Sequence, residues 1–258
     1  MSPVSLARPL ALVALLALAA CSSETVTVAI PTAGVRAPEL SADTVRVDEP
    51  ELRNTARVGY PVLGRAAAAE RVNRQIRGVA TRAAAEFRRT EPPGPDAGMS
   101  EVSDVQGHFE VDLLTDGLFS FNQAIWAYTG GAHGNTFFFP QTYNLRTGAT
   151  VGLADVIAPS DAAWQALADG ARAELFRQAR GRFGLDPGDD PAEWLFADTI
   201  EPDRETFEAI WTIAPDSLVI HFAPYAVAPY AAGSWRVPVA YADLAGHLGP
   251  VARDLAGR

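Results

Sequence analysis

The sequence predicts an α+β fold of mostly antiparallel sheets, in which each half of the chain has one main helix packed on a sheet face. Three observations lead to this prediction. Residues 66–89 and 162–182 repeat apolar side chains at steps of three and four, as amphipathic helices do. Several shorter segments alternate apolar and polar residues, as half-buried strands do. The order of elements is strand–helix–strands in the first half and strands–helix–strands in the second.

Residues 1–20 have the features of a leader peptide. Arg8 precedes an apolar run that ends at Ala20, and this run is shorter than the ~20 residues that a membrane-spanning helix needs. The run ends Leu18-Ala19-Ala20-Cys21, the lipobox pattern of bacterial lipoproteins, and Cys21 is the single cysteine of the chain. We therefore expect lipidation of Cys21 and stable anchoring by its acyl chains. The alternative is an ordinary signal peptide followed by a chance cysteine.

The predicted organisation has four parts. Residues 1–20 are the lipoprotein signal peptide, and residues 21–45 are the lipidated cysteine with a flexible tether rich in small polar residues. Residues 46–104 form a smaller strand–helix region, and residues 105–250 form a larger α+β domain. Ser22 follows the cysteine where an aspartate would retain a lipoprotein in the inner membrane. This indicates a bacterial cell envelope location on the outer membrane, facing the periplasm.

In the first half, the pattern predicts a strand over residues 51–63 and a helix over residues 66–89. The helix has one apolar stripe and several arginines on its other faces, which we interpret as a solvated side. Phe109, Val111 and Leu113 are predicted to share one face of a strand. An Asp116-Gly117 turn then leads to a strand over 118–128, and a further strand is predicted over 136–145.

In the second half, Ser160 or Asp161 is predicted to cap the helix over 162–182. An acidic loop follows over residues 184–204. The remaining predictions are a hairpin with strands 206–213 and 218–222, a strand over 234–239 and a short helix over 241–248 that ends at Gly249-Pro250.

Composition excludes several classes of function. The chain has 31 acidic and 21 basic residues and a net charge of −10, so a nucleic-acid partner is not expected. Every basic residue is arginine, which rules out Schiff-base chemistry and a P-loop lysine. The four histidines have no metal-binding spacing, and the acidic cluster Asp189, Asp190 and Glu193 lacks the spacing of a calcium loop. We predict no metal, no cofactor and no catalytic residue.

Two segments are candidates for ligand binding. Gly131, His133 and Asn135 lie in a glycine-rich loop after a strand, where a ligand can approach the backbone. The second segment carries Tyr225, Pro229 and Tyr230, and rigid proline beside amphipathic tyrosine is suited to an interface. The alternatives are that His133 only holds its own loop and that the tyrosines cap the core. Trp126, Tyr128 and Trp235 could form a sugar-stacking platform or belong to the core.

The blocks YTGGAHGNTFFFPQTYNLRTGATVGLADVI (Tyr128–Ile157) and SLVIHFAPYAVAPYAAGSWRVPVAYADL (Ser217–Leu244) resemble an extracytoplasmic domain of unknown function. That domain forms the outer region of the lysozyme-sensing anti-sigma factor RsiV and precedes the catalytic domain of the deacetylase PdaC. Residues 60–76 are similar to its smaller N-terminal partner region. The resemblance implies an α+β module outside the cytoplasmic membrane. It does not imply an enzyme, because the deacetylase activity belongs to a separate domain.

Together these features predict an envelope lipoprotein whose module binds a protein or cell-wall ligand without catalysis. The membrane is contacted through the acyl chains on Cys21. A basic, lysozyme-like protein would suit the negative net charge, and a peptidoglycan fragment is the other candidate ligand. The alternative function is a peptidoglycan-directed hydrolase or deacylase that uses His133 with a carboxylate.

Overall fold

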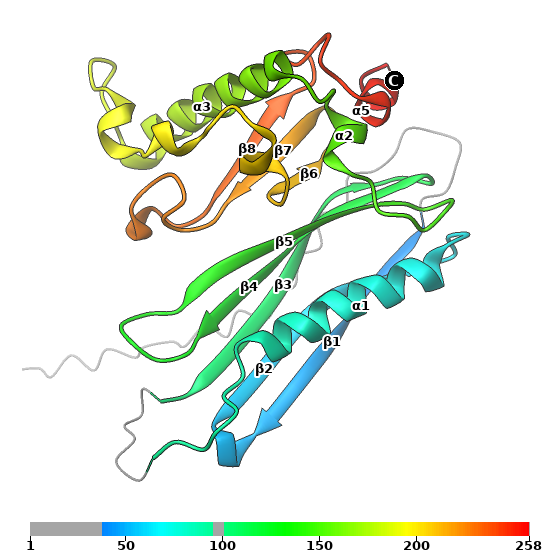
Figure 1. Ribbon diagram of the computed structural model, residues 1–258, viewed down its shortest axis with the longest axis vertical. Helices are drawn as coiled ribbons and strands as arrows, with labels where there is room; N and C mark the ends of the chain where they lie inside the picture. The colour runs from blue at the N-terminus through cyan, green and yellow to red at the C-terminus, as the bar shows by residue number, and fades with distance from the viewer. Residues whose placement is uncertain (1–37, 95–100, 258) are drawn as a thin grey trace, which may run out of the picture.

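The computed structural model describes residues 38–94 and 101–257 (Figure 1). The predicted signal peptide, Cys21 and most of the predicted tether lie outside the described residues. Within the described residues, no helix has both the length and the apolar character that crossing a membrane requires. The fold is mixed α+β with mostly antiparallel pairing, so the predicted fold class is confirmed.

The first sheet has five strands in the order β1-β2-β3-β4-β5. These strands are β1 (Glu39–Glu49), β2 (Asn54–Gly64), β3 (Ser103–Leu114), β4 (Leu118–Tyr128) and β5 (Asn135–Asn144). Helix α1 (Ala69–Glu86) follows β2, and the chain then returns so that β2 and β3 pair in parallel. The other pairs are antiparallel. The predicted helix and the strands over 118–128 and 136–145 are confirmed to within a few residues.

The second sheet has three strands in the order β6-β7-β8. These strands are β6 (Trp211–Ile213), β7 (Ser217–Phe222) and β8 (Trp235–Ala240). The α-helices of this half are α2 (Leu153–Val156), α3 (Asp161–Phe183), α4 (Arg204–Phe207) and α5 (Pro250–Ala256). The short 3₁₀-helices of this half are η2 (Pro191–Trp194), η3 (Ala197–Thr199) and η4 (Tyr230–Ala232). Ser160 caps α3 by accepting a hydrogen bond from the Ala163 amide, as predicted. Helix α3 packs on β8, and β6 and β7 lie over β3, β4 and β5 (Figure 1).

The N-terminal boundaries differ from the prediction. Strand β1 begins at Glu39, so residues 39–45 belong to the sheet and not to the tether. Its small polar residues suggested a linker, but β1 is an edge strand whose side chains are mostly exposed. The boundary between residues 104 and 105 does not separate the two sheets either, because β3 crosses it and pairs with both β2 and β4.

Two predicted elements near the C-terminus are also wrong. Asp203 accepts a hydrogen bond from the Thr206 amide and so caps the short helix α4. Because this helix occupies the start of the expected strand 206–213, the strand begins only at Trp211. The segment 241–248 forms successive turns, and the helix begins at Pro250 instead of ending there. Proline at the first helical position lacks only an amide hydrogen that would have no partner inside the helix, so it starts a helix readily.

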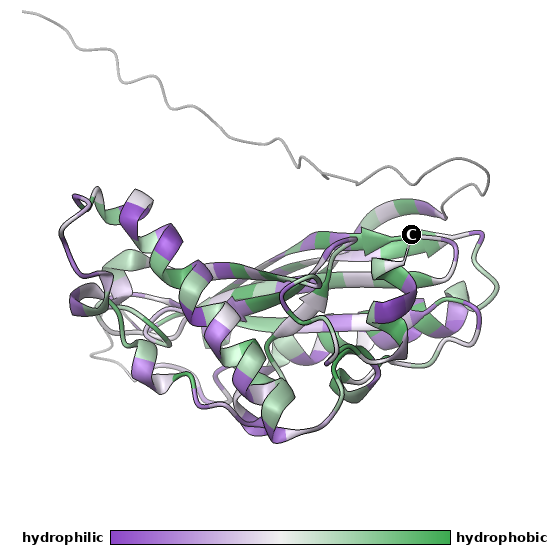
Figure 2. Ribbon diagram, turned by 90° about the horizontal axis from the view of Figure 1, so that it is seen from above, coloured by the Kyte–Doolittle hydropathy of each residue, from purple (hydrophilic) through white to green (hydrophobic). Residues whose placement is uncertain are grey.

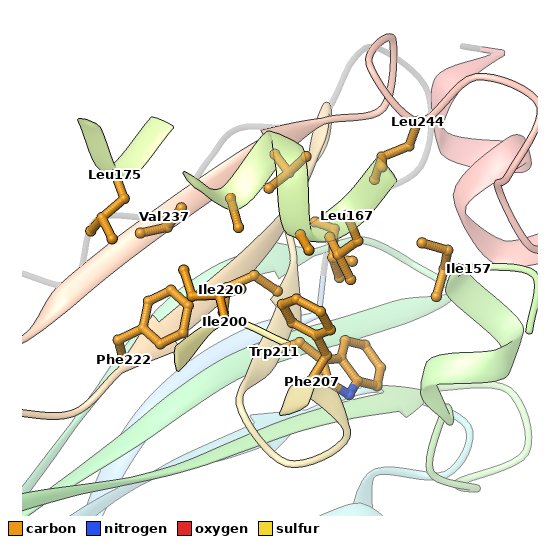
Figure 3. Close-up of a cluster of buried hydrophobic side chains, with 14 of the residues drawn as sticks. Ile157, Leu167, Leu175, Ile200, Phe207, Trp211, Ile220, Phe222, Val237 and Leu244 are labelled. Carbon is orange, nitrogen blue, oxygen red and sulfur yellow. The ribbon is translucent and has the colours of Figure 1, made fainter. Parts of the chain in front are cut away.

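The apolar faces of the two sheets point away from each other. In the first sheet, Val58, Phe121 and Ile125 pack with Ile76 of α1 in one hydrophobic cluster. In the second sheet, the side chains that pack beneath α3 form a separate cluster, which includes Leu175, Ile220 and Val237 (Figure 3). Hydrophobic and hydrophilic residues alternate along the long strands (Figure 2). Each sheet therefore covers its apolar face with its own helix, and the more polar faces meet.

A β-bulge lies where the two layers meet. Val111 pairs with Phe121 and Leu113 pairs with Ser120, so Asp112 is an extra residue in β3. An extra residue reverses the alternation of the strand beyond it. Leu113 consequently packs in the cluster of the second layer, and Leu114 packs in that of the first. The prediction that Phe109, Val111 and Leu113 share one face is therefore wrong for Leu113.

Candidate functional site

The glycine-rich loop after β4 holds His133 at the surface. Gly130 and Gly131 have φ values of 106° and 93°, a backbone region that favours glycine. His133 is exposed, and its Nδ1 lies 2.9 Å from the carbonyl oxygen of Gly134. A carbonyl can only accept, so Nδ1 carries the proton of this hydrogen bond and Nε2 is left unprotonated in the neutral ring.

The segment between β7 and β8 reaches this loop. The ring of Tyr230 stacks on His133 with a centroid distance of 3.9 Å and an interplanar angle of 23°. The Tyr230 hydroxyl also donates to the Gly134 carbonyl oxygen at 2.7 Å. Tyr225 lies beside both rings, with its centroid 5.3 Å from that of Tyr230 and 6.4 Å from that of His133. The structure thus brings together two candidate segments that are about ninety residues apart in sequence.

Tyr225 has an unusual conformation for an exposed aromatic residue. Its φ is +71°, and its side chain is 54% exposed. A non-glycine residue in this region carries a strain of about 1–2 kcal/mol. The surrounding chain holds it there, since the Ala226 carbonyl accepts a hydrogen bond from Thr199 at 3.0 Å and the Val227 carbonyl accepts one from the Phe196 amide at 2.8 Å.

The other predicted binding residues have supporting positions. Pro229 is exposed and precedes η4, which begins at Tyr230. The Gly131 carbonyl accepts a hydrogen bond from the Tyr128 hydroxyl at 2.9 Å. Asn135 uses its side-chain oxygen to accept from the Thr136 amide at 3.0 Å, so this side chain caps the start of β5 instead of joining the aromatic contact.

Gly134 fixes the loop against the sheet. A Cβ at this position would lie 2.4 Å from a ring carbon of Trp126, so the glycine allows the backbone to approach the indole. Trp126 and Tyr128 lie side by side on β4 with their rings 6.3 Å apart and inclined by 11°. Trp235, by contrast, is buried in the core with the Arg182 guanidinium 3.8 Å from its ring centroid. Trp235 is therefore excluded from a sugar platform.

The exposed aromatic surface extends beyond the predicted segments. Within residues 38–94 and 101–257, the exposed large hydrophobic side chains are Trp194, Phe196 and Tyr225. The hydrogen bond from the Phe196 amide to the Val227 carbonyl places Phe196 beside the tyrosine segment, whereas the Trp194 ring lies 5.6 Å from the ring of Phe183 on α3. We call the set His133, Phe196, Tyr225 and Tyr230 the aromatic surface. Sequence reasoning missed Trp194 and Phe196 because they lie in a segment that reads as an acidic loop.

Acidic residues lie in the segment that precedes Phe196. Asp189, Asp190 and Glu193 are exposed in the segment that carries Trp194. Asp190 accepts from the Ala192 amide at 3.0 Å and Asp189 accepts from the Asp186 amide at 2.8 Å, so both carboxylates also shape the loop. No group of three or more potential metal ligands occurs in the described part of the chain.

A second polar group, which the sequence did not reveal, lies buried where the two sheets meet. Asp112 Oδ2 accepts from the Thr212 hydroxyl at 2.6 Å, and the Thr212 oxygen is 2.7 Å from His221 Nε2. On the other side, Asn122 Nδ2 lies 3.2 Å from His221 Nδ1. Arg236 donates to Asp112 Oδ1 from Nε at 3.1 Å and from Nη2 at 2.5 Å. We call these five residues the interlayer network.

The interlayer network is buried and shifts the pKa of its carboxylate. Burial alone raises the pKa of Asp112, but His221, whose Nε2 lies 3.6 Å from Oδ2, and the hydrogen bonds from Thr212 and Arg236 outweigh burial and hold this pKa below its ordinary value. Thr212 and His221 are fully buried, at 0% and 2% exposure. A substrate cannot reach either side chain, although a hydroxyl, an imidazole and a carboxylate are in contact.

Part of the chain matches a known family model. Residues 154–242 match a family model described as "Protein of unknown function (DUF3298)". No curated protein matches the sequence. The matched segment runs from α2 to just past β8, so it supplies Thr212, His221 and Arg236 of the interlayer network but neither Asp112 nor Asn122.

Solved structures with a similar fold carry the same family name. A member of the DUF3298 family from Bacteroides fragilis is 16% identical, with a TM-score of 0.55, covering 86% of this chain and 99% of that chain. A DUF3298 family protein from Pseudomonas aeruginosa is 19% identical, with a TM-score of 0.53, covering 82% of this chain and 95% of that chain. These likenesses show the fold. The resemblance to RsiV and PdaC stays a prediction.

Proposed function

We propose that this chain is an envelope lipoprotein whose folded module binds a ligand without catalysis. The observation that carries the proposal is the aromatic surface, in which two distant segments meet and present a strained, exposed tyrosine beside a stacked histidine and tyrosine. Strained residues persist where the surrounding structure holds them, and they concentrate at binding sites. Exposed aromatic side chains gathered on one face are typical of protein interfaces.

The chemistry around the aromatic surface favours a basic protein as its partner. Asp189, Asp190 and Glu193 are exposed in the segment that precedes Phe196, and the whole chain has a net charge of −10. Such charges increase the rate of encounter with a basic partner, and aromatic rings contact arginine and lysine side chains favourably. A lysozyme-like protein meets this description, and the predicted resemblance to the RsiV outer domain adds support.

Lipid anchoring in the proposal is supported by the residues Leu18-Ala19-Ala20-Cys21. Several acyl chains on Cys21 would together give stable anchoring, since a single chain binds a membrane only marginally. They would hold the module on the periplasmic face of the outer membrane.

A binding titration with a basic lysozyme tests the function. Tyr225→Ala should weaken binding at least tenfold, because truncating a central aromatic contact costs about 2 kcal/mol or more. Thr81→Ala, an exposed change on α1, is the matched control and should bind like the wild type. The binding should also weaken as salt is raised. Equal affinity of the two variants would contradict the assignment of the surface.

The hydrolase alternative gains no support from the site. Among the described residues, His133 contacts the Gly134 carbonyl and two tyrosine rings, and no carboxylate lies within hydrogen-bond distance of it. An acid/base mechanism needs such a partner or a nucleophile. Turnover of cell-wall fragments that His133→Ala abolishes, at an unchanged melting temperature, would overturn the non-catalytic proposal.

A further inference from the structure

A transverse row of side chains crosses the polar face of the first sheet. Register places Arg46 opposite Arg57, Arg57 opposite Gln106, and Gln106 opposite Trp126. These four residues come from four successive strands and point to the face opposite α1, because their neighbours Ala56, Val58, Val105 and Ile125 pack in the cluster beneath that helix. Arg46, Arg57 and Gln106 are exposed, and Trp126 is partly exposed.

The arginine pair has no hydrogen-bonded or ion-paired partner within the described residues, although the charge of Arg46 helps to lower the pKa of Asp43 on the same strand. Neither guanidinium makes a hydrogen bond or an ion pair there, although like charges directly opposite each other destabilise an antiparallel pair. In the second layer, by contrast, Arg172, Arg177, Arg204 and Arg236 all pair with carboxylates.

The nearest acidic residue of β3 is already engaged. Asp104 lies one row away and accepts hydrogen bonds from Thr55 at 2.8 Å and from Gln106 at 3.0 Å. Asp48 lies opposite Thr55 in that same row and is not within ion-pair distance of either arginine. The two guanidinium groups therefore keep their donors available to a ligand.

The other end of the row is aromatic and held in place. Trp126 and Tyr128 are nearly parallel, and the Tyr128 hydroxyl is fixed by its bond to the Gly131 carbonyl. Adjacent strands are about 4.8 Å apart, so the arginines lie roughly 10–14 Å from Trp126 across the sheet. Flat rings present a negative face to the C–H groups of a sugar, and arginine binds carboxylates through two parallel hydrogen bonds.

We infer that this row, Arg46-Arg57-Gln106-Trp126, is a binding site for an acidic glycan. The sugar rings contact Trp126 and Tyr128, Gln106 supplies a hydrogen bond at the centre, and the two arginines hold a carboxylate. A neutral glycan does not use the arginine pair, and a basic partner is repelled by it. The site goes beyond the proposed function, because its charged end lies on β1 and β2, outside the aromatic surface, and either site can fail alone.

Two tetrasaccharides of equal length test this inference. One alternates N-acetylglucosamine with N-acetylmuramic acid and carries free lactyl carboxylates, and the other is the neutral chitotetraose. Calorimetric titration of the mature chain should show at least tenfold tighter binding of the acidic probe. The double variant Arg46→Gln/Arg57→Gln should remove this preference. Its melting temperature should not fall, because the substitution relieves a like-charge pair.

The matched control is Arg71→Gln/Arg82→Gln. These exposed arginines also lack ion pairs within the described residues, and they lie on α1 across the sheet, so the control changes the net charge equally. It should keep the preference for the acidic probe. Equal binding of the two probes by the wild type, binding of neither, or an unchanged preference in the Arg46/Arg57 variant would overturn the inference. Lysozyme binding through Tyr225 would be unaffected by any of these results.

Discussion

Removing the carboxylate of Asp112 should destabilise the protein strongly. Asp112 is 8% exposed and accepts hydrogen bonds from Thr212 and Arg236, which belong to the other layer. Breaking a buried ion pair by deleting one partner costs about 3–5 kcal/mol. The Arg236 side chain is 45% exposed and can regain contact with water when its partner is removed. We therefore expect Asp112→Ala to lower the free energy of unfolding by about 2–4 kcal/mol.

Thermal and urea unfolding measure this effect. At roughly 2–4 °C per kcal/mol for a chain of this size, the melting temperature should fall by about 4–16 °C. Asp116→Ala is the control, since Asp116 forms only an exposed ion pair with Arg146 and its removal should cost less than about 1 kcal/mol. A loss of less than about 1 kcal/mol for Asp112→Ala would refute the view that this carboxylate joins the layers.

The same network predicts a pH dependence. The pKa of Asp112 is lower in the folded protein than its ordinary value, so its ionised form contributes stability above the unfolded-state pKa of about 4. This contribution is lost as pH falls through the lower, folded-state pKa. The difference in stability between the wild type and Asp112→Ala should therefore be complete at pH 6 and should narrow steadily below pH 4. A difference that stays constant to pH 2 would contradict this assignment.

Three further predictions concern single residues. Gly134→Ala should destabilise by about 1–3 kcal/mol and alter tryptophan fluorescence, because the new methyl group overlaps the Trp126 ring; unchanged fluorescence and stability would refute that contact. Tyr225→Gly should raise the free energy of unfolding by up to about 1 kcal/mol, since glycine tolerates the positive φ at this position. The same change should weaken lysozyme binding, and a loss of stability would show that the backbone is not strained. Cys21→Ser should give a mature product without acyl chains by mass spectrometry, and an unmodified wild-type residue 21 would remove the case for anchoring.

Local patterns were sufficient for most elements of the fold. Helix α3 has its cap at Ser160, its apolar stripe and its C-terminal Gly184 at φ 64°, and all three are features of neighbouring residues. The Asp116-Gly117 turn and β4 are equally local, and the predicted strand over 118–128 matches the observed bounds. The errors fall where local signals are silent. The parallel pairing of β2 with β3 is one such case, and the bulge at Asp112 is another.

The candidate site divides in the same way. The two surface segments could be predicted from the sequence, because a glycine-rich loop and a segment rich in proline and tyrosine have recognisable compositions. Trp194 and Phe196 were missed, since their neighbours are acidic and nothing in the sequence pairs Phe196 with Val227. Asp112 and His221 were also missed, because an alternating strand gives the same pattern whether its polar face meets water or another polar face.

The sequence by itself determined most of the helices and strands, most of their apolar faces, and two of the surface segments that carry aromatic rings. Those properties follow from backbone propensity and from periodicity over short windows. Only the tertiary structure decided that the two sheets meet through their polar faces, that His133 stacks on Tyr230, and that Arg46 opposes Arg57 in a row ending at Trp126. Such contacts join strands far apart in the chain, and their register depends on the packing of all the layers together.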